Sequence, residues 1–216
     1  MKHLYLLSGL GVDERVFQYL DLSEHHITNI QWIPHQKGES IKTYAKKLTA
    51  QITTQKPILI GLSFGGMVAI EIGKLIETEK IILISSIKER KELPLYFKLS
   101  AMIKLHHLIP AQLLKKPNAA LYWFFGVYAQ REKHLLNDIL LETDPHFLKW
   151  AIDQILRWDN TVIPQNLQHI HGTSDRIMPH RFINKKIEIK NGGHFMTITK
   201  ADEVTAILKE LLSDKS

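Results

Sequence analysis

The chain has 216 residues, of which 44% are hydrophobic and 23% charged, and these proportions exclude a disordered or collagen-like protein. It contains no cysteine, which excludes disulfides, a thiolate nucleophile and cysteine metal sites. Its formal net charge is +6. The first apolar run, Leu4–Leu7, is too short for a signal peptide or a membrane span, so we expect a cytoplasmic protein without a transmembrane segment.

Apolar runs and helical patterns alternate along the first 87 residues. We predict strands at 3–8, 27–33, 57–62 and 80–85, and helices near 13–20, at 40–54 and directly after residue 63. Asp13 and Ser40 stand where helix N-caps are expected. This alternation is typical of a parallel sheet that is covered by helices on both faces.

The region 88–160 contains no strand-like run. It reads as helices at 93–107, 119–129, 132–142 and 146–158. Strands at 166–171 and 185–190 and a closing amphipathic helix then resume the earlier pattern. We therefore predict a core formed by residues 1–87 and 161–216, with a helical cap inserted at 88–160.

The start of this insert is basic. Seven cationic residues stand against Glu89 and Glu92, namely Lys88, Arg90, Lys91, Lys98, Lys104, Lys115 and Lys116. A solvated basic face is the ordinary explanation, and attraction of an acidic partner is the alternative. No nucleic-acid recognition motif accompanies the charge, so we expect no nucleic-acid partner.

The stretch Gly61–Gly65 fits the pattern G-x-S-x-G, with a buried-looking strand before it and an apolar helix after it. A sharp strand-to-helix turn exposes the serine hydroxyl at the carboxyl edge of a sheet, and its glycines let strand and helix approach closely. Ser63 is therefore the predicted nucleophile. The backbone N–H of Phe64, at the start of the helix, is placed to stabilise negative charge there.

A serine nucleophile needs a base and an acid that orients the base. Asp175 follows the strand at 166–171, and His194 follows the strand at 185–190. Both are thus expected at the same sheet edge as Ser63, in the chain order Ser, Asp, His. Asp153 and Asp159 are the alternative acids, but they belong to the helical insert.

These motifs resemble those of the α/β-hydrolases over essentially the whole chain. The resemblance implies a mostly parallel sheet of about six strands, flanked by helices, with the helical cap inserted after the strand at 80–85. It identifies "LLSGLGVDERVF" as the oxyanion loop, in which the Leu10 N–H would partner that of Phe64. Ser8 stands where the family usually has histidine. The chain begins at what would be the family's third strand, so it resembles a shortened member.

Within the family, the helical insert and "GGHFMTITKADEV" are similar to small carboxylesterases such as the pimeloyl-acyl-carrier-protein methyl ester esterases. That resemblance implies an acidic acyl carrier protein as a possible partner, docking on the basic cap.

The working hypothesis is a serine hydrolase that cleaves an ester or thioester through an acyl-enzyme, with no cofactor and no metal. The cap is expected to supply the substrate pocket from among Phe97, Met102, Trp123, Phe124 and Trp150. A non-catalytic ligand-binding protein on the same fold is the alternative from another class. A carbon–carbon bond hydrolase, a peptidase or a lipase would use the same three residues.

Overall fold

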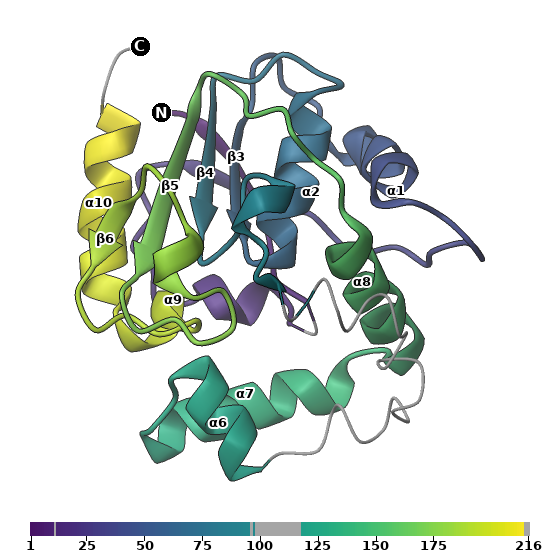
Figure 1. The fold of residues 1–216 in the computed structure, drawn as a ribbon. Coiled ribbons are helices and arrows are strands. Elements are labelled where there is room, and N and C mark those ends of the chain that lie inside the picture. Colours follow the sequence, from purple (N-terminus) through teal and green to yellow (C-terminus); the bar gives the residue numbers. More distant parts are fainter. Residues whose placement is uncertain (11, 96, 98–117, 214–216) are drawn as a thin grey trace.

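The computed structural model describes residues 1–10, 12–95, 97 and 118–213, and its strands form a single sheet (Figure 1). The strands are β1 (His3–Leu7), β2 (His26–Asn29), β3 (Ile58–Leu62), β4 (Lys80–Ile84), β5 (Leu167–Gly172) and β6 (Ile187–Ile189). They lie in the order β2-β1-β3-β4-β5-β6, and every neighbouring pair is parallel. The predicted parallel sheet of about six strands is confirmed.

Helices connect these strands. The α-helices are α1 (Ile41–Leu48), α2 (Phe64–Gly73), α6 (Ala119–Phe125), α7 (Gln130–Glu142), α8 (Pro145–Arg157), α9 (Met196–Thr199) and α10 (Ala201–Ser213). Short 3₁₀ helices span Glu14–Phe17, Thr49–Gln51, Arg90–Glu92 and His180–Phe182. Both predicted N-caps are confirmed, because the side chains of Asp13 and Ser40 accept hydrogen bonds from the N–H groups of Arg15 and Thr43.

Three helix predictions differ from the structure, those near 13–20, at 40–54 and at 119–129, and the last of these ends at Phe125. The helix near 13–20 is only a short 3₁₀ helix, Glu14–Phe17, whose Val16 and Phe17 enter the core. The helix predicted at 40–54 ends at Leu48 and continues as a 3₁₀ turn in which Thr49 Oγ1 donates to Lys46 O at 2.7 Å. The helix predicted at 93–107 lies mostly outside the described residues.

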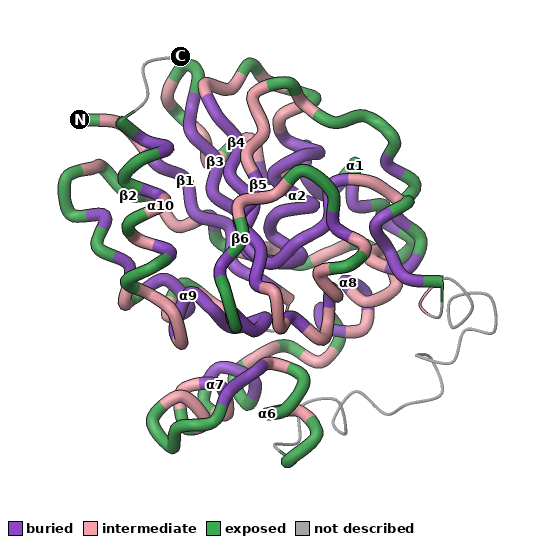
Figure 2. Tube along the Cα trace, turned by 60° about the vertical axis from the view of Figure 1, so that its left-hand side comes forward, coloured by how far each residue is buried: buried purple, intermediate pink, exposed green. Residues whose placement is uncertain are grey.

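The sheet separates two hydrophobic cores, as the alternation along β1 shows. Leu4 and Leu6 belong to the core on the α10 side, while Tyr5 and Leu7 belong to the core on the side of α1 and α2. Every residue of α2 from Phe64 to Ile72 is buried, as expected for an apolar helix packed on the sheet. Figure 2 shows the central strands and α2 as mainly buried, whereas α6 and α7 carry many exposed residues.

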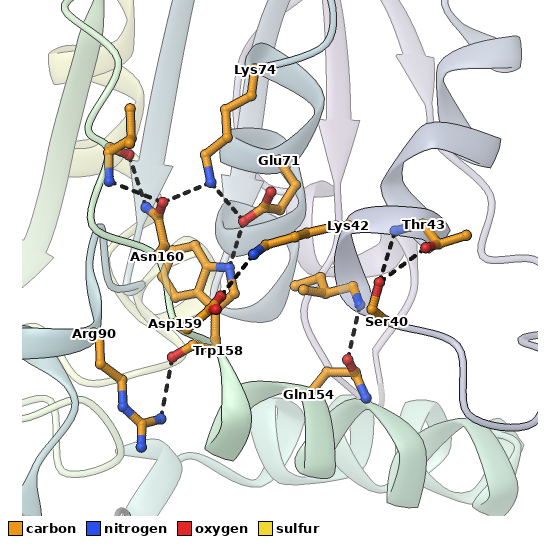
Figure 3. A network of polar contacts seen from close by, with 12 residues as sticks. Ser40, Lys42, Thr43, Glu71, Lys74, Arg90, Gln154, Trp158, Asp159 and Asn160 are labelled. Atoms are coloured by element: carbon orange, nitrogen blue, oxygen red, sulfur yellow. Dashed lines mark hydrogen bonds and ion pairs between the residues drawn. The ribbon is translucent and has the colours of Figure 1, made fainter.

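The helices α6 and α7 lie beyond the carboxyl ends of the strands, and α8 returns beside α1 (Figure 1). A polar network fixes the end of α8 (Figure 3). Glu71 of α2 accepts hydrogen bonds from Trp158 Nε1 at 2.7 Å and from Lys74 Nζ at 2.8 Å, and Lys74 Nζ also donates to Asn160 Oδ1 at 2.6 Å. The chain is therefore held to α2 where it returns from the helices to β5.

The predicted boundaries of the cap, residues 88 and 160, stay a prediction. Among the described residues, no helix combines the length and the apolar character needed to cross a membrane.

Candidate active site

Ser63 occupies the turn between β3 and α2 in a strained backbone conformation. Its φ of 52° and ψ of −118° lie in a region that non-glycine residues rarely adopt. The turn is also very tight: a Cβ atom on Gly65 would lie 2.2 Å from the carbonyl oxygens of Leu7 and Ser8, and one on Gly61 would lie 2.5 Å from the Cα atom of Gly66. Glycines at these positions allow the strand, the helix and the preceding loop to meet.

The three residues predicted to react lie together. His194 Nε2 is 3.0 Å from Ser63 Oγ, and His194 Nδ1 is 2.8 Å from Asp175 Oδ2. All three are buried, with 7%, 4% and 4% of Ser63, Asp175 and His194 exposed. Ser63 follows β3, Asp175 follows β5 and His194 follows β6, so parallel strands bring them to one edge. The geometry permits His194 to accept the Ser63 proton while Asp175 holds its other nitrogen.

Backbone groups fix the Asp175 carboxylate and the turn at Ser63. Asp175 Oδ1 accepts hydrogen bonds from the N–H groups of Ile177 at 2.9 Å and Met178 at 2.8 Å. The carbonyl oxygen of Ser63 accepts one from Ser86 Oγ at 2.6 Å. Sequence reasoning missed Ser86, although its place directly after the strand at 80–85 put it at the same sheet edge.

The alternative acids lie elsewhere. Asp159 forms an exposed ion pair with Lys42 at 2.9 Å, and Asp153 pairs with Arg157 at 2.8 Å. The His194 ring has Asp175 as its carboxylate partner in this structure. Geometry therefore favours Asp175 over both alternatives.

The loop after β1 lies against the turn at Ser63. A Cβ atom on Gly9 would lie 3.4 Å from Ser63 Cβ, and Leu10 lines the same cavity as Ser63 and His194. Ser8 fastens this loop, because its Oγ donates to the carbonyl oxygen of Val12 at 2.9 Å and accepts from Trp32 Nε1 at 2.9 Å. A hydroxyl and an indole N–H thus hold the loop at the point where the resemblance led us to expect histidine.

Phe64 is the first residue of α2, so its N–H has no acceptor within the helix. Its ring points away into the core on the α1 side, where it lies 5.8 Å from the Trp32 ring. Leu10, which lines the cavity at Ser63, and Phe64, which directly follows Ser63, are the two residues predicted to supply the oxyanion donors. That role stays a prediction.

A small apolar cavity of about 80 Å³ opens at Ser63. Its described lining comprises Gly9, Leu10, Val12, Leu62, Ser63, Phe125, Ile155, Ile177, Met178, His194 and Phe195. Phe125 of α6 meets the His194 ring edge-on, with ring centroids 5.7 Å apart, and its carbonyl oxygen accepts from the N–H of Phe195 at 3.0 Å. The carboxyl end of α6 is therefore attached directly to the His194 loop.

Of the cap residues predicted for the pocket, Phe97, Trp123, Phe124 and Trp150 are described, and none of them is among the described lining of this cavity. Trp123 and Phe124 are 50% and 46% exposed, and the Arg176 guanidinium lies 4.4 Å from the centre of the Trp123 ring. Trp150 is buried on the α1 side, where its Nε1 donates to the carbonyl oxygen of Glu39. Phe97 is half-buried against that same core, and Met102 lies outside the described residues.

This difference has a simple cause. Spacing along a helix says which residues share a face, but not how far the helix is rotated when it docks. In α6 the face toward His194 carries Phe125, one residue beyond the predicted pair.

A larger cavity, of about 540 Å³, lies between the start of α1 and α8 and includes Trp150. It contains none of Ser63, Asp175 and His194 among its described lining, so the chemistry assigns the candidate site to the smaller cavity. Among the residues placed by the structure, no group of three or more histidine or carboxylate side chains is arranged to hold a metal ion.

Sequence comparison finds no relative: no protein-family model matches, and no curated protein matches. Solved structures do match. An esterase from Exiguobacterium antarcticum is 15% identical with a TM-score of 0.75, the match covering 99% of this chain and 92% of that one. A lipase-esterase related protein from Clostridium acetobutylicum is 17% identical with a TM-score of 0.73, covering 97% and 94%.

A bromoperoxidase from Bacillus anthracis is 19% identical with a TM-score of 0.66, covering 99% of this chain and 92% of that one. Proteins with such different names share this architecture, so the likeness establishes the fold and leaves the chemistry to the site. The parallel sheet, the strained Ser63 turn and these matches over nearly the full chain lead to one conclusion: the protein has the α/β-hydrolase fold.

Proposed function

We propose that the protein is a serine hydrolase that cleaves a carboxylic ester or thioester with a small acyl group. The observation that carries this proposal is the continuous contact from Ser63 Oγ through His194 to Asp175, at 3.0 and 2.8 Å, beside an apolar cavity. A hydroxyl next to a buried imidazole–carboxylate pair is the arrangement that activates a serine.

In the proposed mechanism, His194 takes the proton of Ser63 as its oxygen attacks the acyl carbon. Asp175 keeps the Nδ1 proton of His194 directed toward itself and stabilises the imidazolium that forms. The N–H groups of Leu10 and Phe64 stabilise the oxyanion. His194 then protonates the leaving group, and it activates the water that releases the acid from Ser63.

The size of the cavity supports a small acyl group. At about 80 Å³ it is well below the roughly 300–1000 Å³ typical of sites for drug-sized ligands. Its described lining is apolar apart from Ser63 and His194, which favours a hydrocarbon chain over a polar substituent.

Hydrolysis of p-nitrophenyl acetate, butyrate and octanoate tests both the serine hydrolase activity and the preference for a small acyl group. Wild type should cleave the shorter esters with the higher kcat/KM, and Ser63→Ala should lower kcat by roughly 10⁴-fold or more. Ser23→Ala, which changes an exposed serine far from the cavity, is the matched control and should keep full activity. Equal turnover by wild type and Ser63→Ala would refute the proposal, and a preference for octanoate would refute the small acyl group.

The competing functions make different predictions. A non-catalytic binding protein would turn over none of these esters, whereas a lipase would prefer the octanoate and gain activity at a lipid surface. A peptidase or a carbon–carbon bond hydrolase would cleave amide or β-diketone substrates faster than esters of matched size.

An acidic acyl carrier protein is a further proposed partner, and its basis is the basic sequence segment. Lys88 does not belong to a solvated face, because it is 4% exposed and paired with Glu92. Lys98 and Lys104 lie outside the described residues, and their reversal to glutamate offers the test. Carrier-linked turnover should fall while turnover of the free ester stays unchanged, and equal effects on both would remove the carrier.

A further inference from the structure

Two histidines stand on one face of β5 inside the core. His169 and His171 are 2% and 0% exposed, and residues two apart in a strand share a face. Asp175 follows in the loop after the same strand. A buried imidazole is costly unless both of its nitrogens have partners, so the contacts of these rings indicate what they do.

The rings form a continuous chain of hydrogen bonds. Lys88 Nζ lies 3.0 Å from His169 Nδ1, and His169 Nε2 lies 3.3 Å from His171 Nδ1. His171 Nε2 lies 2.7 Å from the carbonyl oxygen of Met178. The chain therefore runs from a buried ammonium group to the backbone next to Asp175.

The partners at the two ends fix where every proton lies. The Met178 carbonyl only accepts, so His171 carries its proton on Nε2 and accepts on Nδ1. His169 must then donate from Nε2 and accept at Nδ1, and the Lys88 ammonium, which only donates, supplies that bond. All three donors thus point toward Met178, and each ring has a single tautomer.

Neutral rings are required for this arrangement, and their surroundings keep them neutral. Burial lowers the pKa of His171 to about 4 and holds the pKa of His169 well below its ordinary value, where the charge of Lys88 adds to the effect. In the part of the chain that the structure describes, the charged and titratable groups that act on the two rings are Lys88, Lys186, Asp175, His180 and His194.

The Lys88 end of the chain is anchored. Lys88 Nζ pairs with Glu92 Oε1 at 2.8 Å and donates to the carbonyl oxygen of Asn184. Glu92 is 1% exposed and accepts from the N–H groups of Lys88 at 2.7 Å and Asn184 at 3.0 Å. The buried charges of Lys88 and Glu92 are therefore paired with each other and hydrogen-bonded to backbone groups. These contacts hold the Lys88 end of the hydrogen-bond chain in place.

The other end acts on Asp175. The Met178 carbonyl is held by His171, while the Met178 N–H donates to Asp175 Oδ1 at 2.8 Å. His171 Nε2 itself lies 3.7 Å from Asp175 Oδ2, the oxygen that contacts His194. The His171 ring thus braces the backbone that orients the carboxylate and places a positive N–H dipole beside it.

We propose that His171 is a positioning residue for the Asp175–His194 pair, and that Lys88 and His169 fix the tautomer in which it acts. The proposal rests on the proposed hydrolase function, and it assigns His171 a role through Met178 and Asp175 with no contact to substrate. A residue that only filled the core would be replaceable by an apolar side chain without effect on the reacting groups.

The test compares His171→Leu, His171→Gln and the core control Ile81→Ala, all assayed with p-nitrophenyl butyrate. Ile81 is fully buried on β4, in register with Leu167 of β5. His171→Leu should lower kcat by about ten- to a hundredfold, because small displacements of reacting groups have effects of that size, with KM within about twofold of wild type. His171→Gln keeps an N–H for Met178 and should recover kcat to within about threefold of wild type.

A spectroscopic signature separates positioning from general loosening. The proton between His194 Nδ1 and Asp175 Oδ2 should give a far-downfield NMR resonance, which Asp175→Asn should abolish and thereby assign. His171→Leu should shift or broaden this resonance, whereas Ile81→Ala should lower Tm and leave both the resonance and kcat unchanged. If His171→Leu does not fold, His169→Leu replaces it, because it removes the donor that fixes the His171 tautomer.

The outcomes are distinct. Activity that survives in Ser63→Ala overturns the hydrolase function itself. If Ser63→Ala is inactive but the leucine variant keeps wild-type kcat and an unmoved resonance, only the positioning role is overturned. An equal fall in kcat for His171→Leu and Ile81→Ala overturns it as well, because the effect would then follow lost stability.

Discussion

The turn between β3 and α2 and the helix α6 border the same cavity, but different contacts fix them. At the turn, backbone lies against backbone, so that a Cβ atom on Gly65 would come within 2.2 Å of two carbonyl oxygens. At α6, the described contacts with the His194 loop include a phenylalanine ring, a backbone hydrogen bond and the approach of Gly126 to Gly193, while Trp123 and Phe124 stay half exposed. The comparison teaches that local sequence sets the position of Ser63, and docking of a helix sets the shape of the pocket.

The difference between the Ser63 turn and α6 is tested with the largest expected effect at one glycine in each, Gly65 and Gly126. Gly65→Ala should cost about 4 kcal/mol of unfolding free energy or more, or prevent folding, because the added atom meets backbone on the neighbouring loop. Gly126→Ala at the end of α6 should cost about 1–2 kcal/mol, from its φ of 72° and a 3.0 Å approach to Gly193. Urea unfolding measures both, and equal costs would show that the turn is no more constrained than the cap.

Acid should lower the unfolding free energy of the protein through His171, which is buried at the end of β5. His171 is neutral when folded, with a pKa lowered from 6.5 to about 4, so the unfolded chain binds the extra proton between these values. Stability is complete above about pH 6.5 and falls as the pH drops toward 4, by about 3 kcal/mol at most from His171.

The unfolding free energy measured by urea between about pH 4.5 and 7.5 checks this sign. His171→Leu should make the dependence shallower and leave the part that comes from His169, while His134→Leu, at an exposed position of α7, should leave it unchanged. A wild-type stability that rises as the pH falls through this range would contradict the neutral ring.

Phe125 and its neighbour sharpen the account of the pocket. Phe125→Ala should lower kcat/KM for p-nitrophenyl butyrate by about tenfold, because the ring lines the cavity and touches His194. Phe124→Ala removes a ring of the same kind that is 46% exposed and should stay within about twofold of wild type. A larger loss of kcat/KM in Phe124→Ala than in Phe125→Ala would favour the pocket residues predicted from the sequence.

The smallest expected effect concerns the loop after β1. Trp32→Phe removes the hydrogen bond that the Trp32 N–H donates to Ser8 Oγ. It should lower kcat by about three- to tenfold with little change in KM. Ser8→Ala breaks the same bond, so the double variant should be no worse than the more impaired single variant. Additive losses would mean that the two side chains act separately.

The sequence was sufficient to predict the parallel sheet and the meeting of Ser63, Asp175 and His194 at one of its edges, because both depend on local signals. That these three residues react stays a prediction. Glycines around Ser63, and polar residues directly after strands, mark the edge where Ser63, Asp175 and His194 meet. The N-caps at Asp13 and Ser40 were equally local. In these cases the position of a residue at the end of a strand or the start of a helix is enough to predict where it lies in the fold.

The features that sequence reasoning missed depend on contacts between distant segments. Phe125, Trp32 and Ser86 gain their places from the docking of α6, from the path after β2 and from the end of β4. The buried pair of His169 and His171 also has no local signature, because its partner Lys88 lies 81 residues from His169 and reads in sequence as part of a basic surface. Tertiary burial overrides the ordinary expectation for a lysine.

The central claim is that Ser63 is an activated nucleophile. Treatment of the native protein with a fluorophosphonate, followed by peptide mass spectrometry, tests it most directly. We predict one adduct, on Ser63, that disappears in His194→Ala and after unfolding in urea, because the serine reacts only next to the imidazole. A native protein that stays unlabelled at Ser63, or that labels equally after unfolding, would contradict the account.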